Sequence, residues 1–165
     1  LIQSVKYLSN NNLVNDRKAH ESVKTGLWFA VLGLISGSIW ARFTWGNWWV
    51  NDTKLNGAAI ATLIYLAYLV LRSSISEEQK RARIAAVYKL FAYVMMIVFI
   101  QVLPRMTDSL HPGNGGNPAF SNYDLDNNLR LVFYPAVLAW ILVAYWIYTI
   151  RCRMAEIRIK LNTDD

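Results

Sequence analysis

Four long apolar runs constrain the fold of this chain more than any other feature. They cover residues 25–41, 55–71, 84–104 and 131–150, and the third alone contains a charged side chain, Lys89. A bilayer core about 30 Å thick takes roughly 20 apolar residues in a helix, and backbone polar groups in lipid must be satisfied within their own segment. The sequence therefore predicts an all-α polytopic membrane helix bundle, with four transmembrane helices at about 25–42, 55–71, 84–104 and 128–150.

Composition excludes several other classes of protein. Hydrophobic residues make up 55% of the 165 residues and charged residues only 17%. A disordered chain needs low hydrophobicity and high charge, and a disulfide scaffold needs more than one cysteine. A soluble enzyme is disfavoured because the apolar residues come in long runs. We expect residues 1–165 to form a single membrane domain.

The distribution of basic residues predicts the orientation of the spans. Thirteen of the 17 Lys and Arg residues lie before the first run, near the junction of the second and third runs, or after the fourth. Basic residues concentrate on the cytoplasmic side of membrane proteins, so both termini are predicted to be cytoplasmic. The net charge of +6 then follows from topology, and we expect no nucleic-acid binding. Lys89 is expected to snorkel to the inner interface.

The start of the chain looks like the continuation of something longer. Residues 1–8 resemble the end of an earlier helix, and residues 9–22 look like a polar loop that contains His20. We expect the chain to be a fragment without its upstream spans, and we expect His20 to be solvated. Pro135 is expected in the first turns of the fourth span, where a missing backbone N–H costs little.

Function is expected in the two outer loops, residues 43–54 and 105–127. The spans hold almost no ionisable groups, which disfavours a proton pump or an ion-coupled transporter. The first loop gathers three indoles around a glycine, with an aspartate close behind: Trp45, Gly46, Trp48, Trp49 and Asp52. These indoles form either an aromatic belt at the bilayer interface or a flat apolar platform for a planar ligand.

The second outer loop contains His111, in the segment LHPGNGGNPAF. Taken alone, a loop histidine before a proline is more often a solvated residue. The glycines do not form a phosphate loop, because no strand precedes them and no lysine follows in that pattern. Asp124 and Asp126 are interpreted as a helix cap for the fourth span rather than as a calcium site. Together, an outward tryptophan platform and an outward imidazole suit haem.

These residues carry a family resemblance. WGNWWVNDTKLNG at 45–57 resembles the tryptophan-rich WWD motif of haem-handling proteins in cytochrome c maturation, and the chain resembles the haem exporter protein C (CcmC) family within that group. LHPGNGG falls where this family has an outer-loop histidine. The family is expected to have six spans, so the chain would correspond to the last four, and the family's first axial histidine would lie upstream. Asn51 stands where the family has an aromatic residue and is expected to thin the platform.

The resemblance implies a function of binding and transfer rather than catalysis, with no catalytic residue. It implies haem b, held on the periplasmic side of the bacterial inner membrane and presented to the haem chaperone CcmE. The implied partner subunits are CcmA, CcmB and CcmD, in contact with membrane lipid. His111 would be an axial ligand of the haem iron, and the residues facing haem would be Trp45, Gly46, Trp48, Trp49 and Asp52.

Three alternatives stay open. A CcsA-like protein, which attaches haem to apocytochrome c, carries the same motif. A structural subunit of a membrane complex would use the tryptophans only as a belt, with His111 solvated. A channel or transporter for a small solute fits the uncharged spans least well.

Overall fold

The computed structural model describes residues 1–107, 109–111 and 126–164, with side chains described up to 161. Within these ranges the regular structure is helical throughout. The elements in chain order are α1 (Ile2–Asn10), α2 (Leu13–Trp45), α3 (Thr53–Ser73), α4 (Glu78–Ile97), the π-helical turn η1 (Val98–Val102), α5 (Leu103–Met106) and α6 (Asn127–Asp164).

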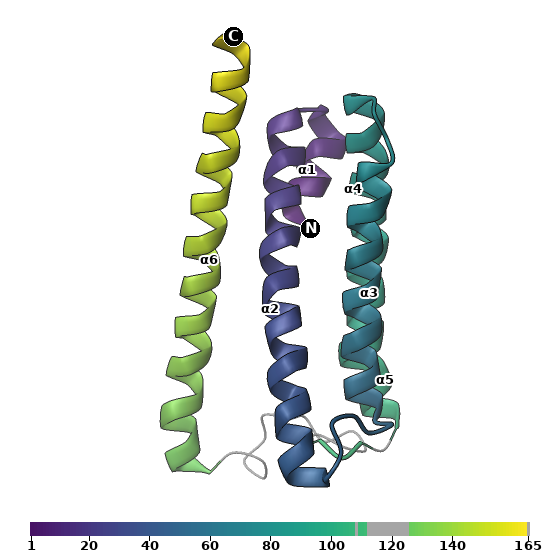
Figure 1. Cartoon of the computed structure of the whole chain (residues 1–165), viewed down its shortest axis with the longest axis vertical. Coiled ribbons are helices and arrows are strands. Elements are labelled where there is room, and N and C mark those ends of the chain that lie inside the picture. Colours follow the sequence, from purple (N-terminus) through teal and green to yellow (C-terminus); the bar gives the residue numbers. More distant parts are fainter. Residues whose placement is uncertain (108, 112–125, 165) are drawn as a thin grey trace.

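Four of the helical segments are long and apolar enough to cross a membrane, as predicted. They are Leu13–Trp45, Thr53–Ser73, Glu78–Met106 and Asn127–Leu161, the third formed by α4, η1 and α5 together. These segments run side by side along the long axis of the molecule (Figure 1). Helix α2 contacts α3, α4 and α6, while α3 packs against α4 and η1. The chain is therefore a multi-pass membrane protein.

One prediction about helix boundaries was wrong, and another was right only in position. Residues 9–22 are not a loop, because α2 begins at Leu13, where the side chain of Asn12 accepts a hydrogen bond from the backbone N–H of Val14. Pro135 lies in the first turns of the span, as predicted, but it is about two turns into α6, where its missing N–H removes a hydrogen bond within the helix. The helix cap predicted for the fourth span is confirmed at Asp126, whose carboxylate accepts the backbone N–H of Leu129 at 2.6 Å. Asp124 lies outside the described residues.

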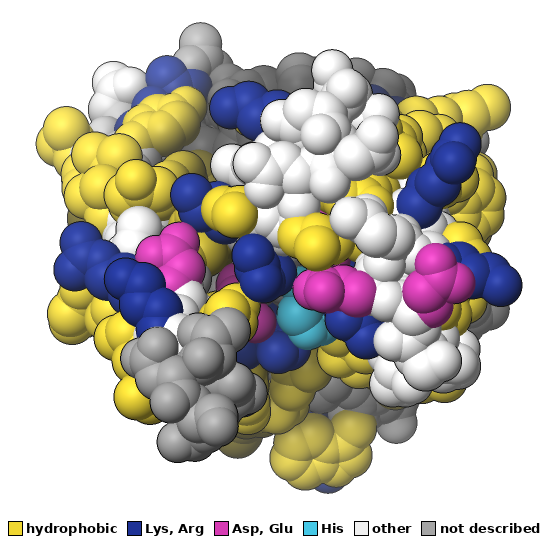
Figure 2. Space-filling model, turned by 90° about the horizontal axis from the view of Figure 1, so that it is seen from above, with side chains coloured by type: hydrophobic (Ala, Val, Ile, Leu, Met, Phe, Trp, Pro, Cys, Tyr) yellow, Lys and Arg dark blue, Asp and Glu magenta, His cyan; other side chains and the backbone are white. Residues whose placement is uncertain are grey.

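The two ends of the bundle differ in chemistry. One end, named here the basic end, carries α1 and the C-terminal end of α6 (Figure 1). Seen from that side, Lys and Arg side chains gather over it with Asp and Glu between them (Figure 2). The opposite end, named the loop end, carries the α2–α3 connection at residues 46–52 and residues 107 and 109–111. Both chain ends thus share the basic end, as the predicted topology requires.

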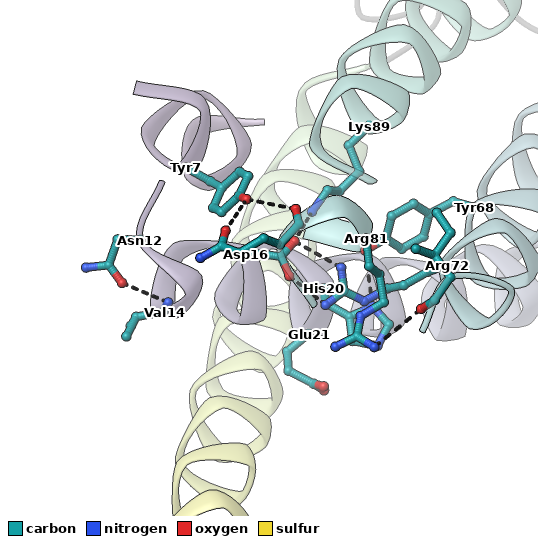
Figure 3. A network of polar contacts seen from close by, with 12 residues as sticks. Tyr7, Asn12, Val14, Asp16, His20, Glu21, Tyr68, Arg72, Arg81 and Lys89 are labelled. Carbon is teal, nitrogen blue, oxygen red and sulfur yellow. Dashed lines mark hydrogen bonds and ion pairs between the residues drawn. The ribbon is translucent and has the colours of Figure 1, made fainter. Parts of the chain in front are cut away.

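A buried ionic network joins α2, α3 and α4 at the basic end (Figure 3). Asp16 accepts two hydrogen bonds from Arg72, at 3.0 and 2.5 Å, and Lys89 lies 3.4 Å from the same carboxylate. The side chain of Lys89 is only 4% exposed and lies 5.3 Å from the ring centre of Tyr68. The prediction that Lys89 snorkels was wrong, because Asp16 supplies a counter-charge inside the bundle.

His20 also belongs to this region rather than to solvent. Its Nδ1 lies 3.2 Å from the hydroxyl of Tyr68 on α3. The neighbouring Glu21 pairs with Lys24 and, across to α6, with Nε of Arg151 at 2.9 Å. The prediction of a solvated His20 was wrong because the helix turns this residue toward α3. The polar residues before the first apolar run therefore hold helices together.

Helices α3 and η1 approach each other closely near the loop end. A Cβ atom added to Gly57 would lie 2.4 Å from the backbone carbonyl oxygen of Phe99, a distance that real Cβ atoms do not tolerate. Only glycine leaves room for this contact. The contact fixes the position of α5 and of the segment that follows it relative to the start of α3.

Candidate functional site

Two segments that are far apart in the sequence meet at the loop end. One is the start of α3 with the residues just before it, and the other consists of residues 107 and 109–111, which follow α5. The hydroxyl of Thr107 donates a hydrogen bond to the hydroxyl of Thr53 at 3.0 Å. Together with the close contact at Gly57, this bond places His111 beside the tryptophan-rich segment.

Asp52 is the central acceptor of this junction. As the N-cap of α3 it accepts the backbone N–H groups of Lys54 and Leu55, at 3.0 and 3.2 Å. Its other oxygen accepts the backbone N–H of Leu110 at 2.7 Å, and its Oδ1 lies 2.9 Å from Nδ1 of His111. Its side chain is 1% exposed. One buried carboxylate therefore joins the helix start to the histidine segment.

The environment of Asp52 favours the ionised carboxylate. Burial acts to raise its pKa, but hydrogen bonds from the Ser109 side chain and from the backbone of Leu110 and Leu55 lower it. The pKa of Asp52 is consequently held below its ordinary value. A carboxylate that accepts several N–H groups is stabilised in its charged form.

His111 lies against two indoles. Its ring centre is 4.9 Å from that of Trp45, in an edge-on arrangement, and 5.7 Å from that of Trp40. The two tryptophans also meet edge-on, at 4.8 Å. The imidazole is 24% exposed. It is thus a half-buried ring with one edge bonded to Asp52 and aromatic neighbours around it.

Gly46 ends α2 and shapes the turn into the motif. Its φ of 81° lies in the left-handed region that favours glycine, which is the usual way for a helix to end. The guanidinium of Arg42 donates to the carbonyl oxygen of Gly46 and closes this turn. Open space surrounds the position of an added Cβ. The observed role of Gly46 is to reverse the chain direction after Trp45.

The remaining motif indoles face outward. Trp48 is 60% and Trp49 44% exposed. Nε1 of Trp49 donates to the side-chain oxygen of Asn56, and Asn56 donates in turn to Asn51 at 2.7 Å. Asn51 therefore contributes to holding the segment that carries Trp49, in addition to its predicted effect on the platform. Trp48 and Trp49 therefore leave large apolar rings on the surface of the tryptophan-rich segment.

Trp40 was missed by the sequence analysis. It lies in the last turns of α2, where it completes the aromatic surroundings of His111. Its position, a tryptophan at the end of an apolar run and shortly before the motif, was the available signal. That signal was read only as part of a membrane span.

A cavity of about 530 Å³ runs between α2, α3 and α4 from Lys89 to His111. The α2 wall consists mainly of small and apolar side chains, including Gly26, Ala30 and Gly37. His111 lines the cavity at the loop end. The imidazole therefore borders both the aromatic cluster and the interior of the bundle.

The donor set limits which metals this site suits. In the described ranges, no three His, Cys, Asp or Glu side chains come together as a metal-binding group. A single imidazole can serve as an axial ligand of haem iron.

Comparison with known sequences gives a family match over nearly the whole chain. The family model described as "Heme exporter protein C", CcmC, matches residues 2–164. The matched range includes the tryptophan-rich segment, Asp52 and His111.

Among curated proteins the chain is similar to several named "Cytochrome c biogenesis protein CcsA". It is 31% identical over 102 residues to the protein of Prochlorococcus marinus strain NATL1A, which covers 62% of this chain and 32% of the relative. For strain SARG the identity is 39% over 87 residues, covering 53% and 27%. For Synechococcus sp. strain CC9605 it is 30% over 102 residues, covering 62% and 33%. The matches span about a third of the length of these relatives.

Proposed function

Because the chain belongs to the haem exporter protein C family, we propose that it forms part of a membrane protein that binds haem and delivers it for cytochrome c biogenesis. The haem is haem b, and its site is the loop end of the bundle. In this proposal the loop end faces the periplasm across the bacterial inner membrane, and the basic end faces the cytoplasm.

The observation that carries the proposal is the position of His111. The imidazole contacts the rings of Trp45 and Trp40, and the exposed Trp48 and Trp49 belong to the segment that follows Trp45. A belt of interfacial tryptophans with a solvated histidine would require no such contacts. The packing of imidazole against indole favours a built site.

The residues present fit haem. His111 is a neutral nitrogen ligand of the kind that holds haem iron, and indoles supply flat apolar surface. Haem bound here would supply an iron centre that accepts a ring nitrogen. Trp48 and Trp49 would cover the macrocycle, Trp45 would contact both ring and ligand, and Gly46 would set the turn between them.

Delivery of haem requires that the bond between His111 and the iron be reversible. A single imidazole on a loop segment, 24% exposed, gives a bond that breaks without unfolding a helix. In the proposal the acceptor is the haem chaperone CcmE, and CcmA, CcmB and CcmD are the partner subunits. The exposed loop-end indoles are the surface from which the chaperone takes the haem.

The proposal is tested by titrating haemin into the detergent-purified protein while recording Soret absorbance and tryptophan fluorescence. We expect saturable binding with one haem per chain and quenching of the indole emission. His111→Ala should weaken this binding, whereas His20→Ala, which alters the other histidine at the basic end, should not. Equal binding by both variants would refute the role of His111.

A second candidate is favoured by the names of the curated relatives, which are CcsA proteins. In that case the haem passes to apocytochrome c rather than to a chaperone. Loaded protein is mixed with each apo-acceptor in turn, and haem transfer is followed by gel filtration. Transfer to the chaperone alone supports the first candidate, and transfer to apocytochrome c alone supports the second.

A further inference from the structure

We propose that Asp52 is a positioning residue that acts on haem through His111, by fixing which ring nitrogen of His111 is the iron ligand and by strengthening it as a donor. This inference rests on the proposed haem site. The WWD resemblance implies only that Asp52 belongs to the haem-facing motif and orients nearby donors or the loop, whereas this inference names the donor and its ligand atom.

The first step is that Asp52 points into the protein. Its side chain is 1% exposed, and its two oxygens are occupied by Lys54, Leu55 and Leu110 backbone N–H groups and by the imidazole of His111. A carboxylate with this many donors has no open side for a macrocycle. The effect of Asp52 on haem must therefore pass through a neighbour.

The second step concerns the tautomer of His111. Oδ1 of Asp52 lies 2.9 Å from Nδ1, and a carboxylate oxygen accepts hydrogen bonds but cannot donate them when ionised. The proton of the neutral ring is thus held on Nδ1, and the lone pair is on Nε2. Nε2 becomes the ligand atom. Metal-binding histidines generally donate their other N–H to a carboxylate or carbonyl, which orients the ring and raises its basicity.

The third step concerns how the backbone next to His111 is held in place. The same carboxylate caps α3 and holds the backbone of Leu110, the residue next to the ligand. The hydroxyl of Ser109 accepts the backbone N–H of His111 at 3.1 Å. The histidine segment is therefore anchored to the rigid start of a helix, so that the ring is oriented before any ligand arrives.

A helix cap alone would explain part of this geometry, and the chain offers a matched control for that explanation. Asp126 caps α6 in the same way, with its carboxylate accepting the N–H of Leu129. Asp126 is exposed and lies at the start of a different span. Asp52→Asn and Asp126→Asn each keep a side-chain oxygen for capping and remove one charge. Only the first changes the partner of the imidazole.

The experiment compares full-length chains carrying D52N, D126N, H111A or both D52N and H111A. Haemin affinity and the midpoint reduction potential of the bound haem are measured, with thermal unfolding of the haem-free protein as a folding check. We expect D52N to weaken haemin binding about 10–100-fold, the usual cost of losing such a partner. It should also raise the midpoint potential, because a weaker donor stabilises ferric iron less. D126N should match the unaltered protein.

The double variant decides whether Asp52 acts through His111. We expect D52N to have no further effect on haemin affinity in the H111A background. An equal effect with and without His111 would overturn the inference. So would an unchanged affinity and potential in D52N while H111A loses binding, and in that case the proposed haem site would stand. Unaltered haem binding in H111A would instead reject the haem site itself.

Discussion

Each end of the bundle holds a buried aspartate, but the partners differ. At the basic end Asp16 binds the guanidinium of Arg72 and the ammonium of Lys89. At the loop end Asp52 binds backbone N–H groups and one imidazole. The Asp16 network pairs its charges with one another, whereas the bond to Asp52 engages only one of the two ring nitrogens of His111. An ionic network of the first kind holds helices together, and one of the second kind can serve a ligand.

The largest effect is expected from breaking the basic end. Asp16→Ala leaves Arg72 and Lys89 buried without their shared carboxylate. Removing one partner of a buried ion pair costs about 3–5 kcal/mol. We expect a matching loss in the free energy of unfolding in detergent, while Glu78→Ala, an exposed acidic residue on α4, changes it little. Similar stabilities for the two variants would contradict the structural role of the network.

The next effect concerns the contact that positions the loop end. Gly57→Ala forces a Cβ atom against the carbonyl of Phe99, and overpacking of this kind costs about 1–3 kcal/mol. Gly33→Ala is the matched control, because nothing lies within 4 Å of its added Cβ. We expect Gly57→Ala to lower the unfolding temperature and haemin affinity together. An unchanged unfolding temperature in Gly57→Ala would show that α3 and η1 do not meet this closely.

A smaller effect is expected within the aromatic cluster. Trp45→Ala removes the edge-on contact with His111 and should weaken haemin binding roughly tenfold, or about 1.4 kcal/mol. Trp28, which is 64% exposed on α2, provides the comparison. Trp28→Ala should leave haemin affinity unchanged. Equal losses of haemin affinity in Trp45→Ala and Trp28→Ala would mean that the aromatic cluster acts only as a general aromatic surface.

The smallest effect is expected at the hydroxyl that holds His20. Tyr68→Phe removes the hydrogen bond between the Tyr68 hydroxyl and Nδ1 of His20, at a cost of about 0.5–1.5 kcal/mol in the free energy of unfolding. Haemin affinity should not change, because this bond lies at the basic end. A clear loss of haemin binding in Tyr68→Phe would mean that the two ends are coupled more tightly than the contacts indicate.

The four membrane-spanning helices were predictable, because a long run of apolar residues indicates a segment that lies in lipid rather than in water. The polar contacts between the helices were not predictable. Asp16, His20 and Lys89 are polar residues whose partners come from other helices. From the sequence pattern alone, polar residues of this kind are expected to face water. Their burial depends on pairs formed across the bundle.

The candidate site was predictable in residue type but not in arrangement. Trp45 and His111 were singled out from their chemistry and their loops, and the structure brings them into contact. The bond between Asp52 and His111 joins residues 59 positions apart, and no local period encodes it. Trp40 was hidden because a tryptophan at the end of an apolar run has the same sequence signature whether it faces lipid or a ligand.

The central claim is that His111 is an axial ligand of haem at the loop end. The most direct test is a pair of visible absorption spectra, oxidised and reduced, of the haem-loaded protein beside His111→Ala and His20→Ala. The account predicts a Soret band with sharp reduced α and β bands in the unaltered protein and in His20→Ala, and their loss in His111→Ala. Unchanged bands in His111→Ala would contradict it.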